Sequence, residues 1–592
     1  MRFSPGIDPF RPRWVWLLSV WLLSCWSTPN SAVRADDRWT RVPAEAVLVV
    51  EMDHPARGLQ SEYLARLWET ASQSSELSRK LADQESDRWR HAAQFLEQSL
   101  KTDWKNALDR LTAGGVVLAV VPTAQATPPD VLLFVEADDA ETLRSFVATI
   151  HTELALRDAT AIESQVHHGM TYYRTGEAFY AQTDKTLVAS NSRRLLVESL
   201  DRAGPPAAVE KRRIPVPNRS DRSQSSEPLA AVRGFVSLEW LRGIPEIATA
   251  LRVPATEPAG QLLFGGYLDL FRRGTVAELD VAVDQEGAEL CCRVDAGSTE
   301  RPPEWKGFFA DGVNSRAWPA LNPPGTVYTA SWYRDYQQLW EARRHWLTPD
   351  VIAELETENE RQRKAGMRFG VVDLLEQLGP HFRFVVARAA GDNAREMNWP
   401  HAAFTIDLRD PKAFHKRFVD PLTVLLRVVA GSVGGDVESS TKDGVTAITL
   451  RLTATPENVL PESVVQAINP TLLTGRGYLL VATSNEFAVG VFDEVDRRPS
   501  GPDAASAATT DEQRLSLMAI ADFFAQFRQE LERNVVRDKQ LGPAEAKREV
   551  DLFLTLLQQL DSISSQSQLR ESGFEYRIRL GGGLGTGEQH SR

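Results

Sequence analysis

One strand-to-helix pattern occurs twice in this chain and constrains its fold more than any other feature. VEADDAETLRSFV, residues 135–147, is matched at residues 406–418 by IDLRDPKAFHKRF. In each stretch an apolar strand end is followed by aspartate and then by two apolar residues four positions apart, the first of them Leu143 in one copy and Phe414 in the other. Residues four apart share one face of a helix, so each stretch predicts a strand followed by a helix that packs on a core.

Further matches occur in the same order along both halves of the sequence. Each is a short apolar or alternating run bounded by turn residues, which is typical of strands. The matched pairs are 43–50 with 323–330, 114–121 with 381–388, 130–137 with 401–408, 167–173 with 442–448, 185–202 with 479–497, and 287–294 with 573–580. A fixed order of matches is the signature of an internal repeat.

These matches predict an α+β protein of two tandem units, each with an antiparallel sheet covered by helices. Consecutive strands are joined by short turns, which antiparallel pairs allow and parallel pairs do not. The sequence leaves open whether the two sheets join, and the joint between two such units is the natural place for a cleft. The predicted boundaries are a first unit at 36–300 with a polar insert at 204–228, a linker at 301–321, a second unit at 322–583 with a polar insert at 498–512, and a disordered tail at 584–592.

The first 35 residues predict an export signal. Three arginines precede an apolar run at 14–26, which is shorter than the roughly 20 residues that a membrane span needs. Small residues at Val33 and Ala35 suit signal peptidase, so we expect cleavage after Ala35. An alternative is a lipid anchor on Cys25, because Leu22–Leu23–Ser24–Cys25 loosely resembles the lipobox of bacterial lipoproteins.

Charge and cysteine content narrow the partners and the compartment. Removal of residues 1–35 takes away four arginines and one aspartate, so the formal net charge of the 592-residue chain changes from -13 to -16. An acidic surface of this kind argues against nucleic acids and anionic membranes as partners. Only Cys291 and Cys292 remain after cleavage, so stability must come from packing and not from a disulfide framework. No later run predicts a transmembrane span.

A resemblance rests on the signal, on VPAEAVLVVEMDHP (42–55), and on LVASNSRRLLVESL (187–200). Together with the strand pair and helix between them, these stretches resemble large exported bacterial proteins of a domain-of-unknown-function family. The resemblance supports the fold and implies no activity.

Four motifs invite a chemical interpretation, and a structural interpretation is favoured for each. His167–His168 fits a turn better than a metal site, because adjacent strand residues face opposite ways. Ser439–Ser440–Thr441–Lys442 matches the SxxK pattern of penicillin-binding enzymes but lacks a KTG partner. Asp139 and Asp410 stand where a carboxylate caps a helix. The glycine-rich 581–587 precedes no helix and so does not predict a phosphate loop.

The vicinal cysteines and three tryptophans are the remaining candidates. Alternation along the strand predicts that Cys292 is buried and Cys291 exposed. Trp305, Trp318 and Trp399 stand in proline-rich loops, where an exposed indole could contact a ligand such as a sugar.

The sequence therefore predicts an exported, non-enzymatic envelope protein that acts by binding or scaffolding, with no cofactor and no metal. The expected partner is an envelope protein, a glycan or an apolar ligand. Two alternatives stay open: a periplasmic hydrolase with its site between the two units, and a carrier of an apolar ligand held between helices and sheet.

Overall fold

The computed structural model describes residues 41–55, 61–73, 85–123, 129–157, 162–201, 230–252, 258–296, 301–309, 317–364, 370–388, 400–432, 435–451, 469–497, 509–570 and 573–581. The predicted signal (1–35), the insert 204–228 and the tail 584–592 lie outside these residues, as do Cys25 and Trp399.

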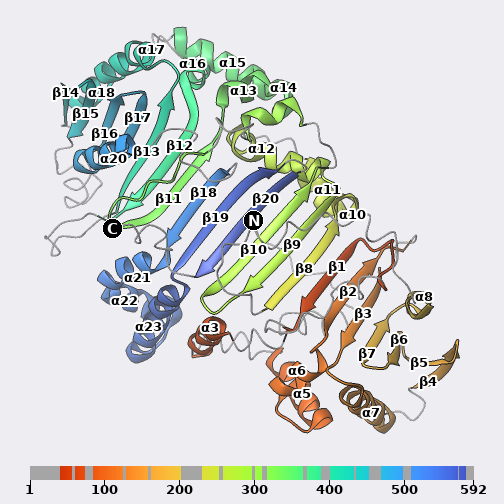
Figure 1. Ribbon diagram of the computed structural model, residues 1–592. Helices are drawn as coiled ribbons and strands as arrows, with labels where there is room; N and C mark the ends of the chain where they lie inside the picture. The colour runs from red at the N-terminus through yellow and green to blue at the C-terminus, as the bar shows by residue number, and fades with distance from the viewer. Residues whose placement is uncertain are drawn as a thin grey trace.

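The described strands form one antiparallel sheet of twenty strands, which runs across the whole molecule (Figure 1). In the first half they are β1 (Leu48–Asp53), β2 (Gly115–Val121), β3 (Asp130–Glu136), β4 (Glu163–His167), β5 (Met170–Thr175), β6 (Ala178–Thr183), β7 (Thr186–Ser190), β8 (Ala230–Ser237), β9 (Val276–Val283) and β10 (Gly287–Asp295). In the second half they are β11 (Thr326–Tyr333), β12 (Leu378–Ala387), β13 (His401–Leu408), β14 (Asp436–Lys442), β15 (Val445–Arg451), β16 (Thr471–Gly475), β17 (Tyr478–Ala482), β18 (Thr509–Ser516), β19 (Ser562–Arg570) and β20 (Gly573–Gly581).

The strands follow the same spatial order in both halves. From the outer edge inward, the first half runs β4-β5-β6-β7-β3-β2-β1-β8-β9-β10. The second half runs β14-β15-β16-β17-β13-β12-β11-β18-β19-β20. β10 and β20 pair antiparallel, with Cys291 opposite Arg577, so the two halves share one sheet.

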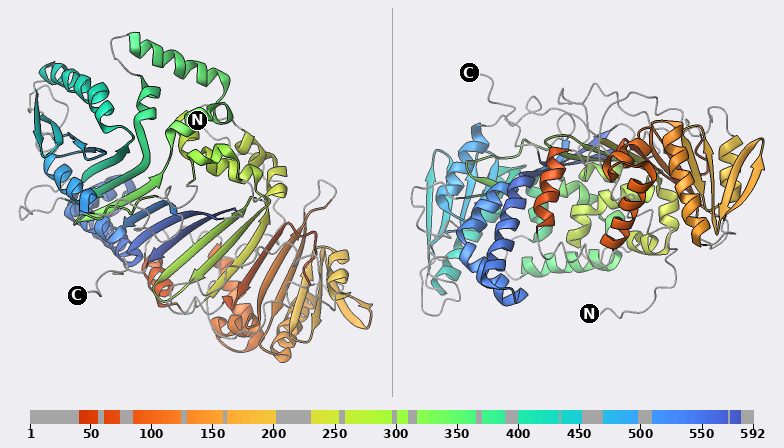
Figure 2. Two further views of the ribbon diagram at one scale, coloured as in Figure 1. Left: turned by 45° about the horizontal axis from the view of Figure 1, so that its top comes forward. Right: turned by 90° about the horizontal axis from the view of Figure 1, so that it is seen from below.

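Helices occupy both faces of this sheet, and Figure 2 shows α3, α6 and α23 gathered on the same side of it. The helical segments are α3 (Glu62–Ser72), α5 (Glu85–Leu100), α6 (Trp104–Leu111), α7 (Ala140–Arg157), α8 (Arg193–Asp201), α10 (Leu238–Gly243), α11 (Pro245–Arg252), α12 (Pro258–Arg273), η3 (Pro303–Gly307), α13 (Tyr336–Glu341), α14 (Arg343–Trp346), α15 (Pro349–Lys364), α16 (Val371–Gln377), α17 (Pro411–Phe414), η4 (His415–Val419), α18 (Asp420–Ser432), α20 (Asn485–Arg497), α21 (Leu517–Gln526), α22 (Arg528–Lys539) and α23 (Pro543–Leu560). Among the described residues, none of these helices combines the length and the apolar character needed to cross a membrane.

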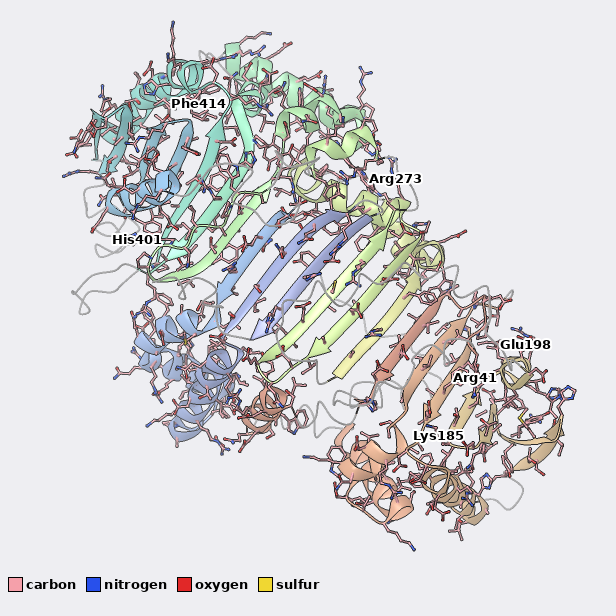
Figure 3. All side chains as sticks on the ribbon, viewed as in Figure 1. Arg41, Lys185, Glu198, Arg273, His401 and Phe414 are labelled. Atoms are coloured by element: carbon pink, nitrogen blue, oxygen red, sulfur yellow. The ribbon has the colours of Figure 1, made fainter. Side chains whose placement is uncertain are left out.

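Strands in the middle of each half, such as β2 and β12, are buried on both faces because helices cover both. β2, GVVLAVV, is buried at every position, so its continuous apolar run fits its surroundings. Leu143 of α7 packs in the core on one face, and Leu195 of α8 packs in the core on the other. In the second half, Phe414 and α18 cover one face and α20 covers the other; Figure 3 labels Phe414 beside the ends of β12 and β13.

The segment predicted as a linker, 301–321, is part of a core where the structure describes it, and this prediction was wrong. Trp305, Phe308 and Phe309 are at most 3% exposed and pack with Leu270 of α12 and Leu339 of α13. Gly266 permits the close approach, since a Cβ there would lie 2.5 Å from Phe308 Cγ. The joint between the halves is therefore a shared core, because α12 of the first half and α13 and α14 of the second bury one apolar surface together.

The predicted insert 498–512 ends too late. β18 begins at Thr509, and Thr509, Thr510 and Asp511 are buried. Threonine is common in strands, and the sequence offered no apolar run to mark this strand.

Candidate ligand-binding site

A pocket of about 460 Å³ lies where the two halves meet. Figure 3 labels Arg273 beside this corner of the sheet, at the end of α12. The pocket is lined from the first half by Arg242, Ala248, Leu251, Gln261 and Arg272, and from the second half by His345, Trp346, Leu347 and Thr348. We call it the joint pocket. Its size is that of a site for a small molecule.

Backbone carbonyls hold the two arginines of the joint pocket in place. Arg242 Nη1 donates to the carbonyl oxygens of Phe271 at 2.9 Å and of Gly274 at 2.7 Å, which are acceptors at the C-terminal end of α12. Arg272 Nε donates to the carbonyl oxygen of Leu251 at 2.7 Å. Cations near a helix C-terminus interact favourably with the helix dipole, so the fold itself fixes both guanidinium groups beside the pocket.

Neither of these arginines forms an ion pair with a carboxylate in the part of the chain that the structure describes. The neighbouring Arg273 differs, because its Nε lies 2.8 Å from Asp269 Oδ2 and its Nη2 lies 2.6 Å from Glu304 Oε1. The joint pocket therefore keeps the positive charge of Arg242 and Arg272, while the charge of Arg273 is neutralised next to it.

Two side chains that line the pocket each have one buried polar atom without a hydrogen-bond partner among the described residues. Gln261 is 2% exposed and its Oε1 has no partner, and Trp346 is 3% exposed and its Nε1 has none. A buried polar group without a partner costs about 1–3 kcal/mol. Both residues belong to the lining of the joint pocket.

Asp269, Glu304 and His345 form a cluster beside the pocket whose ligand atoms lie within 4.8 Å of one another. His345 Nε2 is 3.7 Å from Asp269 Oδ2, and His345 Nδ1 is 3.6 Å from Glu304 Oε1. Burial alone would raise the pKa of Glu304, but its own backbone N–H, His345 and Arg273 outweigh burial and hold that pKa below its usual value. Arg273 forms ion pairs with both carboxylates and offsets one of their two negative charges, so the cluster is an ion-pair network and a poorer site for a cation than two free carboxylates would be.

Neither Trp305 nor Trp318 is among the residues that line this pocket, and Trp399 lies outside the described residues. Trp305 is buried, and its Nε1 donates to Asp269 Oδ2 at 2.8 Å. Its proline-rich flank predicted an exposed side chain, but the shared core buries it. Trp318 is half-buried and stacks on His381, with ring centroids 4.2 Å apart. The guanidinium of Arg383 lies 5.0 Å from the same indole ring. The indole ring of Trp318 is therefore already in contact with two side chains of the protein, and it does not offer a ligand a free stacking surface.

His381 and Asp407 form a histidine–carboxylate pair, the arrangement that a hydrolase would need. His381 Nδ1 lies 3.0 Å from Asp407 Oδ2, and His381 Nε2 is buried without a partner. The hydroxyl of Ser331, on the adjacent strand β11, donates to the carbonyl of Trp318 and not to the imidazole. This pair is stacked against Trp318, and neither of its residues is among those that line the joint pocket.

The turn predicted at His167–His168 is confirmed, but the two imidazole rings do not face opposite ways, because their centroids lie 4.2 Å apart and both rings approach Asp201. His168 and Gly169 have φ of 45° and 80° between β4 and β5, and Asp443 and Gly444 have φ of 51° and 75° between β14 and β15. Two consecutive residues with positive φ make the tight hairpin turn that Gly favours at the second position. His167 Nε2 pairs with Asp201 Oδ1 at 2.8 Å, on the surface of the first half.

The predicted helix caps are also confirmed. Asp139 Oδ1 accepts from the backbone N–H of Thr142 at 2.7 Å, and Asp410 Oδ1 accepts from that of Ala413 at 2.9 Å. The backbone N–H of Thr142 is the largest of the effects that lower the pKa of Asp139. Both carboxylates act as structural acceptors.

The assignment of the two cysteines to faces was wrong. Cys291 is buried at 4% exposure, and Cys292 is the partly exposed one. The face of the sheet that carries Cys291 also carries Arg293 and Glu575, and this charged face is buried. The charged residues next to Cys291 in the sequence pattern therefore did not indicate an exposed face. Burial, with a smaller contribution from Glu575, raises the pKa of Cys291 to about 11, which makes the thiol a poor nucleophile.

No family model matches this chain, and no curated protein matches it. Solved structures with some likeness include two crystal structures of TP0453. Crystal form IV is 11% identical and covers 43% of this chain and 79% of that chain, with a TM-score of 0.22; crystal form III is 12% identical and covers 45% and 81%, with a TM-score of 0.22. At this TM-score the likeness supports no statement about fold or function.

Sequence reasoning missed every residue that lines the joint pocket. The lining comes from segments near residues 245, 265 and 346, and no motif connects them. One local signal was present: two consecutive arginines, Arg272 and Arg273, end an apolar helix, and only one of them could pair with the adjacent Asp269.

Proposed function

We propose that this protein is an exported, non-enzymatic envelope protein that acts by binding a small molecule in the joint pocket. The observation that carries the proposal is a pocket lined by two arginines that pair with no carboxylate of the described residues. The same lining includes Gln261 and Trp346, each with one buried polar atom that has no partner in that part of the chain. Buried polar groups without a hydrogen-bond partner are rare in folded proteins, and a few polar groups within a mostly apolar pocket are typical of a binding site. Export rests on the N-terminal sequence pattern.

We further propose that the two halves are tandem copies of one unit. Supporting observations are the common strand order, the equivalent turns at His168 and Asp443, and the equivalent helix caps at Asp139 and Asp410. In this proposal the binding site belongs to the joint, because residues of both copies line it.

Native mass spectrometry of the mature protein, purified from its own envelope fraction, tests the binding function. Ala248→Trp places a large side chain in the joint pocket, and Thr249→Trp is the matched control, since Thr249 is exposed and does not line the pocket. We expect the native protein and Thr249→Trp to carry a small molecule and Ala248→Trp to carry none. A native protein that carries no ligand, or an Ala248→Trp variant that keeps it, contradicts the proposal.

A second candidate, a carrier of an apolar ligand, is favoured by one observation on the central strands. Leu279 of β9 is 43% exposed, and its strand neighbour Cys292 is also partly exposed. Leu279→Asp separates the two functions. Loss of the captured ligand in Leu279→Asp but not in Ala248→Trp would assign binding to this strip of the sheet.

A further inference from the structure

We infer that the ligand of the joint pocket is an organic oxyanion, a carboxylate or a phosphate joined to a short apolar chain; this inference rests on the binding function proposed above. The nine lining residues include two arginines and one histidine and contain neither aspartate nor glutamate. In a chain with a formal net charge of -13, a described lining with two arginines and no carboxylate is a local reversal of charge.

The guanidinium groups keep donors for the ligand. A guanidinium has five N–H donors. Arg272 uses Nε for Leu251, which leaves the N–H groups of both terminal nitrogens, and Arg242 uses Nη1 for Phe271 and Gly274, which leaves Nε and Nη2. Two parallel N–H groups match the oxygens of a carboxylate or a phosphate, and anchoring by the carbonyls lowers the entropy lost on binding.

One of the two unpartnered buried groups, the indole of Trp346, matches an oxyanion. The indole N–H of Trp346 is a donor only, so its missing partner must be an acceptor. The unpartnered atom of Gln261 is the acceptor Oε1, so an ionised oxyanion does not complete its hydrogen bonding. An oxyanion offers acceptors to Trp346 and to both arginines together.

The remaining lining defines the other end of the ligand. Ala248 and Leu251 of α11 and Leu347 after α14 provide an apolar wall. A pocket of about 460 Å³ leaves room for a short apolar chain beside the charged group. A metal cation is disfavoured, because the nearest carboxylates, Asp269 and Glu304, are held by Arg273.

Isothermal titration calorimetry of the full mature protein with defined probes tests the inference. Octanoate and octyl phosphate carry the two oxyanions, and octan-1-ol has the chain without the charge. We expect both anions to bind at least about 100-fold more tightly than octan-1-ol, since guanidinium–oxyanion pairs are strong charge-assisted hydrogen bonds. The tighter of the two anions identifies carboxylate or phosphate as the natural group.

Variants assign the binding to the pocket. Arg272→Gln keeps a donor for the carbonyl of Leu251 and removes the charge, and it should weaken anion binding about 10-fold or more. Arg272→Lys keeps the charge and should retain part of the affinity, which shows that the loss is not a folding defect. Arg344→Gln is the matched control, because Arg344 is exposed, lies beside the pocket and does not line it.

The outcomes separate the two proposals. Equal binding of octan-1-ol and octanoate, or an equal loss in Arg272→Gln and Arg344→Gln, overturns the oxyanion inference. A neutral molecule found on the native protein and lost in Ala248→Trp also overturns it, while the binding function stands. Absence of any ligand on the native protein, together with no binding of the three probes, removes both.

Discussion

A buried ion pair ties the two halves together beside the shared core. Arg334 Nη1 lies 3.1 Å from Asp511 Oδ1, and the two side chains are 5% and 11% exposed. Ser567 Oγ donates to Asp511 Oδ2 at 2.9 Å, and the hydroxyl of Tyr267, on α12 of the first half, donates to the same oxygen. A residue of the first half thus completes an ion pair of the second.

Asp511→Asn is expected to lower the free energy of unfolding by about 3–5 kcal/mol, because it leaves the buried charge of Arg334 without a counter-ion. The double variant Arg334→Met with Asp511→Leu removes both charges, and it should recover most of this loss, as the cost of desolvating two ions disappears. Urea unfolding of the mature protein, followed by tryptophan fluorescence and circular dichroism, measures each value.

The matched control is an exposed pair. Arg451 Nη2 lies 2.8 Å from Glu438 Oε2, with side chains 62% and 52% exposed, so Glu438→Gln should cost about 0.5 kcal/mol or less. The reasoning is refuted if Asp511→Asn unfolds within about 0.5 kcal/mol of the native protein. The reasoning is also refuted if the double variant is destabilised by as much as the Arg334→Met and Asp511→Leu single variants added together.

Leu143→Ala and Phe414→Ala remove side chains that are 0% and 3% exposed, and each should lower the free energy of unfolding in urea by ~2–5 kcal/mol. Arg144 is exposed, so Arg144→Ala should cost under about 0.5 kcal/mol. The opposite ranking would contradict the placement of Leu143 and Phe414 in the core. Burial raises the pKa of Glu278 from 4.5 to about 7, so the folded protein holds this proton more tightly than the unfolded chain does and stability falls as pH rises from 4.5 through 7. Glu278→Gln should therefore stabilise the protein at pH 8 and have little effect at pH 4, and thermal unfolding that shifts equally at both values would show that burial does not control this group. N-terminal sequencing of exported protein should begin at Asp36; a sequence that starts at the initiator methionine would refute cleavage, and a blocked, lipid-modified N-terminus would favour the anchor.

Local chemistry predicted the parts of this fold that depend on neighbouring residues. The turn at His168–Gly169 and the cap at Asp139 were predictable because a backbone conformation or an exposed N–H demands a few residue types. The antiparallel α+β class followed from alternation and short turns.

Contacts between distant segments were not predictable from pattern. The pairing of β10 with β20 joins strands that stand at the ends of their halves, and no local signal distinguishes a joining strand from an edge strand. The shared core buries Trp305 in a segment whose prolines predicted a loop. The faces of Cys291 and Cys292 were reversed because the central strands also bury their charged face.

The joint pocket illustrates the same limit. Arg272 and Trp346 become neighbours of one cavity only when α12 and α14 pack across the shared core. They become candidate ligand contacts because Arg272 has no carboxylate partner and Trp346 Nε1 no hydrogen-bond partner among the described residues, and a sequence does not show which groups lack partners.

A crystal structure of the mature protein, purified from its own envelope and crystallised without added ligand, tests the proposed binding site most directly. We predict density for a small molecule in the joint pocket, with oxygen atoms within hydrogen-bond distance of Arg242, Arg272 and Trp346 Nε1. A joint pocket that holds only ordered water, with ligand density along Leu279 or nowhere in the protein, would contradict the claim.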